Sequence, residues 1–137
     1  MTRFVRSAAL TLVAATSLAL TTPLASGASS TAVAVYNCST LSVKPATIVL
    51  ACADANQTLT HLKWTAWGTP RAHATGVLGW NTCTPTCAAG SWRTRKVNVT
   101  LSGLTKVAAH WLYTSAHLSP VTGTTVSATV SLPSSAL

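Results

Sequence analysis

Acidic side chains are almost absent from this sequence. Asp54 is the single carboxyl side chain, and no Glu occurs. Glycoside hydrolysis in its common form needs two carboxylates, and calcium sites need several acidic oxygen ligands, so the composition argues against both. The residue types of a Ser-His-Asp catalytic triad all occur in the chain, since Asp54 is accompanied by many serines and by four histidines: His61, His73, His110 and His117. No Gly-x-Ser-x-Gly segment frames a nucleophile, and Asp54 lies in a predicted turn, so we expect no enzyme and no catalytic residue.

The histidines and cysteines do not have the spacing of metal ligands. No two histidines form a His-x-His pair. The only close pair of cysteines, Cys83 and Cys87, is separated by three residues, whereas the cysteine pairs of zinc sites are commonly separated by two. We expect neither a metal nor another cofactor.

The densest group of basic residues is Trp92-Arg93-Thr94-Arg95-Lys96. Arg93 and Arg95 occupy odd-numbered positions, as do the apolar residues that follow, Val97, Val99 and Leu101. In a strand, these side chains would share one face. A continuous strand would therefore point both guanidinium groups along the core face, and burying them without acidic partners costs too much free energy. We expect the strand to bulge, or to begin beyond the sheet edge, and to leave Arg93, Arg95 and Lys96 exposed beside Trp92.

The charge balance favours an anionic partner. Two of the nine basic residues precede residue 29, so residues 29–137 carry seven against one Asp, a net charge of +6 with neutral histidines. Such a chain is attracted to an anionic cell-wall polymer, a membrane surface or an acidic protein, and it shows no specific nucleic-acid signal. The alternative is that the charge only maintains solubility and that residues 92–96 are a solvated strand end.

The first 28 residues have the organisation of a secretory signal peptide. Arg3 and Arg6 precede an apolar run over residues 8–20, and small residues then lead to a predicted cleavage after Ala28. The apolar run has 13 residues, and a membrane-spanning helix needs about 20. We therefore expect residues 1–28 to be removed and residues 29–137 to form one secreted, extracellular domain.

The four cysteines of an exported chain are expected to pair. Three connectivities are possible, and we favour Cys38–Cys52 with Cys83–Cys87, because the short Cys83–Cys87 segment contains a turn-forming proline. On the chain-entropy estimate the smaller loop stabilises the fold by about 2 kcal/mol and the larger one by about 3 kcal/mol.

Residues 46–68 predict a β-hairpin at the centre of the fold. Asp54–Asn56 supplies turn-forming side chains between two strands with period-two alternation. The apolar residues that share a face are Ile48, Leu50 and Cys52 in the first strand and Leu62, Trp64 and Ala66 in the second.

Five more segments read as strands: an edge strand over residues 31–36, a strand over 72–80, one over 92–102, a central one over 107–118 and a last one over 126–132. Gly76 and Gly79 are predicted bulges or points of close backbone approach. With about seven strands and no helical period after the signal, we predict an all-β, immunoglobulin-like β-sandwich with two disulfides; a small barrel is the alternative. The predicted core includes Ile48, Leu50, Leu62, Trp64, Val99, Leu101 and Val130.

The five tryptophans divide into two groups. Trp64, Trp80 and Trp111 share strand faces with apolar residues and are assigned to the core, whereas Trp67 and Trp92 fit that pattern less well. An exposed ring could stack on sugars or bases, but partial packing is the favoured prediction for both, and exposure is the alternative.

Several motifs resemble those of a family of small secreted actinobacterial proteins that is generally uncharacterised. They are Lys44-Pro45 with Ile48, Cys52 to Asn56, Leu62 with Trp64, Asn81 to Gly90, and Val97 to Leu101. The likeness covers about residues 38–102. It implies export and disulfide bonds, and it implies no chemistry.

Two functions follow as hypotheses. The first is a non-catalytic extracellular binding or surface-associated protein that uses Trp92, Arg93, Arg95 and Lys96. The second is a secreted inhibitor of an extracellular protease or glycosidase, with the Cys83–Cys87 loop as the inhibitory element, because rigid loops lose little entropy on binding.

Overall fold

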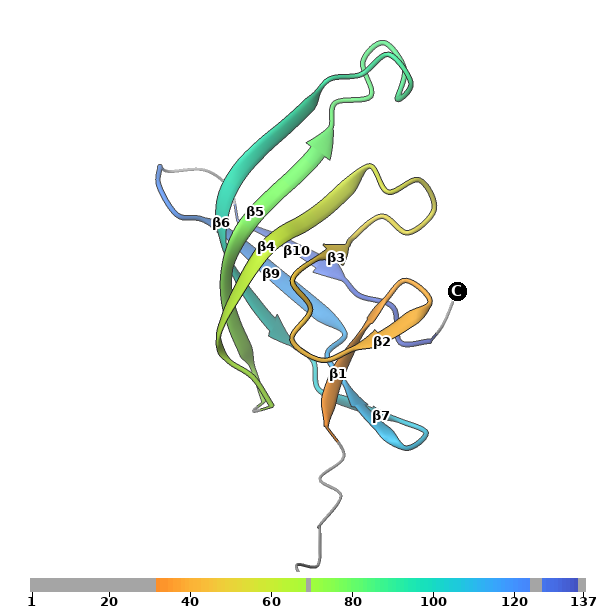
Figure 1. Cartoon of the computed structure of the whole chain (residues 1–137), viewed down its shortest axis with the longest axis vertical. Coiled ribbons are helices and arrows are strands. Elements are labelled where there is room, and N and C mark those ends of the chain that lie inside the picture. Colours follow the sequence, from red (N-terminus) through yellow and green to blue (C-terminus); the bar gives the residue numbers. More distant parts are fainter. Residues whose placement is uncertain (1–31, 69, 124–126, 136–137) are drawn as a thin grey trace, which may run out of the picture.

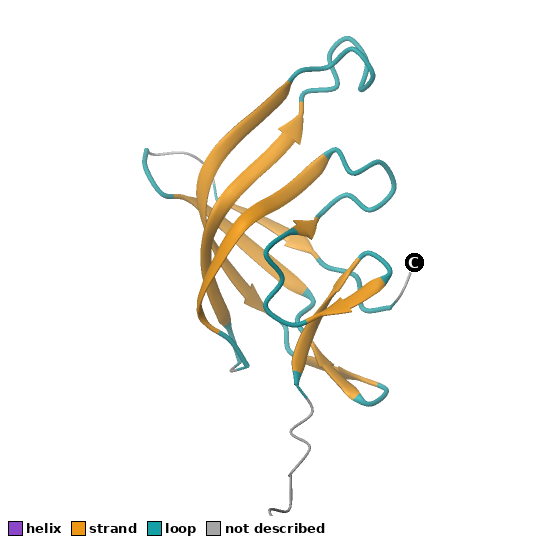
Figure 2. Ribbon diagram, in the orientation of Figure 1, coloured by secondary structure: helices purple, strands orange, loops and turns teal. Residues whose placement is uncertain are grey.

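The computed structural model describes residues 32–68, 70–123 and 127–135. These residues form ten strands and no helix (Figure 2), and none of them belongs to a helix that could span a membrane. The strands are β1 (Val33–Asn37), β2 (Thr40–Ser42), β3 (Ile48–Val49), β4 (Gln57–Ala66), β5 (Ala72–Asn81), β6 (Trp92–Ser102), β7 (Thr105–Val107), β8 (His110–Leu112), β9 (Ser115–Pro120) and β10 (Ala128–Ser131).

The strands form two sheets of different size (Figure 1). The larger sheet is antiparallel in the order β10-β9-β6-β5-β4-β3, and it curves around one side of the molecule. The smaller sheet has the order β2-β1-β8-β7, and its β1–β8 pair is parallel. The prediction of an all-β fold is confirmed, but the described residues contain ten strands instead of about seven.

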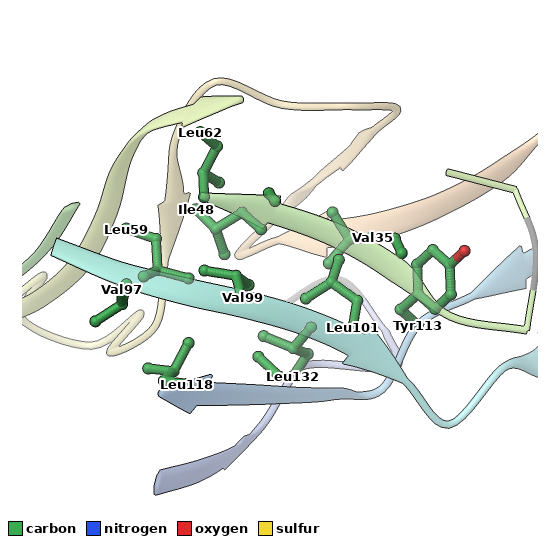
Figure 3. Packing of buried hydrophobic residues seen from close by; sticks show 13 residues of the cluster. Val35, Ile48, Leu59, Leu62, Val97, Val99, Leu101, Tyr113, Leu118 and Leu132 are labelled. Atoms are coloured by element: carbon green, nitrogen blue, oxygen red, sulfur yellow. The ribbon is translucent and has the colours of Figure 1, made fainter. Parts of the chain in front are cut away.

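One hydrophobic cluster joins the two sheets (Figure 3). Alternation along each strand of the large sheet places one set of side chains on its inner face, and Val35 of β1 contributes from the small sheet. The predicted core residues Ile48, Leu62, Val99 and Leu101 are buried. The other predicted members are half-buried and pack against the same cluster: Leu50, Trp64 and Val130.

The predicted hairpin is present as β3 and β4, although β3 is only two residues long. β4 contains a bulge, because its pairing with β5 shifts between Thr60 and Lys63. Gly76 of β5 lies opposite this shift, and a Cβ added there would approach Leu62 Cδ2 to 2.8 Å. Gly76 is therefore a point of close approach, as predicted, while the bulge itself belongs to the neighbouring strand.

Both predicted disulfides, Cys38–Cys52 and Cys83–Cys87, are formed. Cys38 follows β1 and Cys52 follows β3, so the first disulfide connects the small sheet to the edge of the large one. The side chain of Asn37 reinforces this junction, because its Nδ2 donates to the carbonyl of Thr47 (3.0 Å) and its Oδ1 accepts from the amide of Val49 (2.9 Å).

Three aromatic rings meet beside the core. Trp67 makes edge-to-face contacts with Trp64 (4.5 Å between ring centroids) and with the buried Tyr113 (5.4 Å). Trp67 Nε1 donates to the carbonyl of Val33, and Trp64 Nε1 donates to that of Pro45, each at 2.8 Å. Trp67 is therefore partly packed, as predicted, because the indole N–H finds a partner inside the fold.

Two strand predictions are wrong in their extent or position. β1 is not an edge strand, since it lies between β2 and β8. The predicted central strand over residues 107–118 is divided among β7, β8 and β9, because Ala108 turns the chain at a positive φ of 52° and residues 113–114 lead from one sheet to the other. Trp111 lies on β8 with 39% exposure and is not a core residue.

The predicted signal peptide and its cleavage after Ala28 lie outside the described residues. So does Val126, at the start of the predicted last strand, whose described part is β10.

Candidate functional site

The basic segment forms the first half of β6, and all of its residues from Trp92 to Lys96 are exposed. The register with β5 is uninterrupted from the Ala72–Leu101 pair to the Asn81–Trp92 pair. The predicted bulge is therefore absent. The arginines stay exposed although they share a face with Val97, because the β5–β6 hairpin, at the top of Figure 1, extends beyond the part of β6 that pairs with β9.

The exposed half of β6 is also an edge. β9 pairs with β6 only from Val97 to Ser102, so β5 is the only strand paired with residues 92–96 among the described residues. Natural proteins often place charged side chains on exposed edges, because charges oppose pairing with another chain. Edge protection is therefore a structural explanation for the basic residues that competes with binding.

Strand alternation divides the predicted patch between two faces. Arg93 lies opposite Trp80 and Arg95 opposite Leu78, on the inner face that leads into the core. Trp92 lies opposite Asn81 and Lys96 opposite Val77, on the outer face. Arg93 and Arg95 are thus not beside Trp92 on one surface, and the expectation of a single patch is corrected to two surfaces on one hairpin.

On the inner face, a shallow groove of about 240 Å³ lies beyond the core. It is lined by Gln57, Leu78, Trp80 and Arg95. Trp80 was assigned to the core from its parity; it is half-buried and lies outside the core cluster, on the wall of this groove. The groove combines an indole, an amide and a guanidinium group.

On the outer face, a larger depression of about 380 Å³ lies over β4, β5 and β6. Its lining residues are His61, Lys63, Thr75, Gly76, Val77, Lys96 and Val121. Lys96 comes from the predicted patch, whereas no sequence pattern connects it with Lys63 and His61. That link depends on the β4 bulge and on the pairing of β4 with β6 through β5, and neither can be inferred from local spacing.

Trp92 lies farther along the outer face and is 55% exposed. Its ring covers Gly79, since a Cβ built on that glycine would be 3.8 Å from Trp92 Cζ3. One side of the indole therefore rests on the strand backbone, and the ring is presented by a rigid support.

The Cys83–Cys87 loop at the tip of the hairpin is held by hydrogen bonds as well as by its disulfide. The side chain of Asn81 donates from Nδ2 to the carbonyl of Cys87 (2.8 Å) and accepts at Oδ1 from the amide of Cys83 (3.0 Å). Gly90 is required here, because a Cβ at that position would collide with Asn81 Oδ1. The tip is thus a rigid structure adjacent to Trp92.

Asp54 has the surroundings of a turn residue. Its carboxylate accepts hydrogen bonds from the backbone amide (3.1 Å) and the side-chain amide (2.7 Å) of Asn56. These bonds, the backbone one first, lower the pKa of the exposed Asp54 carboxyl below its ordinary value. This arrangement stabilises the charged form of Asp54 and holds the turn between β3 and β4.

Three histidines contact threonine hydroxyl groups. His61 Nδ1 lies 3.1 Å from Thr60 Oγ1, while His73 and His117 each lie 3.2 Å from a threonine on a neighbouring strand. Among the described residues, no three His, Cys, Asp or Glu side chains gather as metal ligands would.

Comparisons of this chain with protein-family models, with curated proteins and with solved structures find no match. The geometry of the site is therefore the basis for a functional proposal.

Proposed function

We propose that the protein is a secreted, non-catalytic binding module that holds an anionic partner on the exposed half of its β5–β6 hairpin. The observation that carries the proposal is the exposure of all five residues from Trp92 to Lys96 on a strand in unbroken register. Strand pairing holds the backbone of these residues in a fixed position, so less backbone conformational entropy is lost when a partner binds.

Electrostatics support an anionic partner of the kind a cell surface offers: a wall polymer, a membrane surface or an acidic protein. Residues 29–137 carry seven Lys and Arg against one Asp. Asp54 already accepts two hydrogen bonds from Asn56. The field around the hairpin is therefore positive and steers anions toward it.

Export is part of the same proposal. The signal-like first 28 residues and the two disulfides support it, because disulfides persist in oxidising compartments. We also propose that the protein is related to the secreted actinobacterial proteins and that its two sheets form an immunoglobulin-type sandwich. The second proposal is supported by two packed sheets and by Trp64, which lies in the strand after Cys52.

A pull-down with purified cell-wall polymers and with anionic lipid vesicles, at low and high salt, tests this function. The test variant changes Arg93, Arg95 and Lys96 to Ser. The control variant changes Lys44, Arg71 and Lys106 to Ser, which lowers the net charge equally and leaves the hairpin intact. We expect salt-sensitive retention of the wild type and of the control, and loss of retention for the test variant.

Two results would contradict the proposal. Equal retention of both variants would show that net charge alone attracts the partner. Unchanged retention of the test variant, together with new aggregation seen by light scattering, would show that the three charges serve to protect the edge of β6.

The rigid hairpin tip favours a second candidate, a secreted inhibitor of an extracellular protease or glycosidase. The disulfide and the Asn81 hydrogen bonds hold this loop in one conformation before any partner binds. Ser91-Trp92-Arg93 also resembles the Trp-Arg triplet of actinomycete α-amylase inhibitors, although Thr94 stands where that family has Tyr. Screening secreted proteases and amylases at micromolar protein tests this candidate, and absence of inhibition argues against it.

A further inference from the structure

We propose that the outer-face depression is a binding site for the phosphate groups of a polyanionic chain, with Lys63, Lys96 and His61 as its ligands. This inference rests on the proposed function and deepens it, because it assigns the partner to one face of the hairpin and gives the partner a chemistry. The depression has a volume of about 380 Å³ and is lined by residues of three neighbouring strands.

The two lysines flank the depression from either side of β5. Lys63 of β4 lies opposite Thr75, and Lys96 of β6 lies opposite Val77. Their backbones are separated by two strand spacings, about 10 Å, and by two residues along the strands, about 7 Å. The four-carbon stem of a lysine is long and flexible enough for both ammonium groups to reach one group held above β5.

The bulge of β4 brings His61 to the same place. His61 has a φ of 54°, a left-handed conformation that is uncommon for residues other than glycine. It lies within the register shift between Thr60 and Lys63. Bulges re-aim side chains and are common next to functional sites, so a non-glycine residue held in this conformation points to a use for the imidazole.

The hydrogen bonds of His61 leave one ring nitrogen for a ligand. Thr60 Oγ1 donates to the carbonyl of Val77 (3.5 Å), so it can accept a hydrogen bond from the Nδ1–H of His61 (3.1 Å). In that tautomer Nε2 is the atom available to a bound group. When Nε2 is also protonated, the ring becomes a third cationic donor beside the two ammonium groups.

Phosphate suits this site better than a carboxylate does. Two ammonium groups from different strands, an imidazole and the exposed Thr75 hydroxyl can surround a group with several oxygens, whereas a carboxylate offers only two. No carboxylate of the described residues is available to neutralise the lysines, since the only one, that of Asp54, is hydrogen-bonded to Asn56. A concave site also favours a narrow chain over the flat surface of a membrane.

The outer face continues in a direction that a chain could follow. Trp92 lies four residues from Lys96 on the same face, about 13 Å along the strand. Its indole is exposed and supported by Gly79. An extended polyanion that leaves the depression along β6 would therefore meet an aromatic ring that can stack on a sugar or another apolar group.

Titration with short-chain inorganic polyphosphate, followed by calorimetry and by amide resonances in NMR spectra, tests the site. We expect K63S and K96S each to weaken binding by about fivefold, the upper range for one exposed ion pair. Each should also reduce the salt dependence of log K by about one unit. K44S and K106S, which remove exposed lysines outside the hairpin, are the controls and should bind as the wild type does. R93S/R95S, on the inner face, should weaken binding less than K63S or K96S does. Resonances of Thr75 and Val77 should shift, and that of Trp80 should not.

Three outcomes would overturn the inference. They are wild-type affinity of K63S and K96S, loss of binding in R93S/R95S alone, and binding to phosphatidylglycerol vesicles without binding to polyphosphate. Each leaves the proposed function standing with a different face or partner. Conversely, polyphosphate binding that depends on Lys63 and Lys96, with no retention of the protein on wall polymers or vesicles, would support the site and contradict the cell-surface role.

Discussion

The two halves of the β5–β6 hairpin have the same local structure and opposite surroundings. In both halves the strands are antiparallel and in register. From Val97 onward, alternate β6 residues are buried to 2% exposure or less, whereas Arg93 and Arg95, on the same face, are exposed. The alternation along a strand thus determines the face to which a side chain points. Whether that side chain is buried depends on whether other strands pack against that part of the face.

The physical difference between the halves is what lies against them. β9 pairs with β6 only over its second half, and every β6 residue of the core cluster lies there. Among the described residues, the first half is paired with β5 alone, and Arg93 and Arg95 are exposed on the inner face, so their guanidinium groups are not fully desolvated. This half is exposed, and the other half contributes side chains to the buried core.

The largest expected contrast comes from truncating one residue in each half. Leu101→Ala removes a fully buried side chain and should lower the free energy of unfolding by about 2–5 kcal/mol. Trp92→Ala removes a larger but exposed side chain and should cost no more than about 1 kcal/mol. Urea unfolding followed by circular dichroism measures both values, and a larger loss for Trp92 would reverse the assignment of the two halves.

A smaller contrast comes from the two glycines of β5. A Cβ at Gly76 would approach Leu62 Cδ2 to 2.8 Å and the carbonyl of Thr60 to 3.0 Å, so Gly76→Ala should destabilise the fold by about 1–3 kcal/mol. At Gly79 the nearest atom, Thr58 Oγ1, is at 3.4 Å. Gly79→Ala should therefore be neutral or stabilising by up to about 1 kcal/mol, since alanine restricts the unfolded chain. In thermal unfolding, Gly76→Ala should lower the midpoint temperature and Gly79→Ala should leave it unchanged or raise it, and equal destabilisation would contradict this contrast.

Local patterns predicted the features that depend on nearby residues. Period-two alternation identified the core half of β6, and the short spacing of Cys83 and Cys87 identified their disulfide. The same reasoning failed for residues 107–118, because both faces of that segment are partly apolar and nothing in the alternation shows where the chain passes from one sheet to the other. Alternation also assigned Trp80 to the core. This was wrong, because odd or even position along a strand does not show where the structure packed against that strand ends.

Only part of the candidate site could be predicted, because local patterns do not show which distant residues the sheet brings together. A run of basic residues is visible in the sequence, so Lys96 could be proposed as a ligand. Lys63 and His61 could not be joined to it, because they are more than thirty positions away and reach it only through β5. The left-handed conformation of His61 results from the bulge, which the pairing of two strands creates and no single segment encodes.

The smallest expected effect comes from the charges themselves. Arg93→Ser removes an exposed cation from the inner face, and Lys96→Ser removes one from the outer face. Because both side chains are exposed, each change should alter the free energy of unfolding by no more than about 0.5 kcal/mol in either direction. Urea unfolding at low salt measures this, and the same preparations can then be used for binding experiments. A loss of more than about 1 kcal/mol for Arg93→Ser, with little change for Lys96→Ser, would indicate that the inner face of the exposed half is covered in solution. In that case only the outer face, with its depression between β4 and β6, would remain available to a partner.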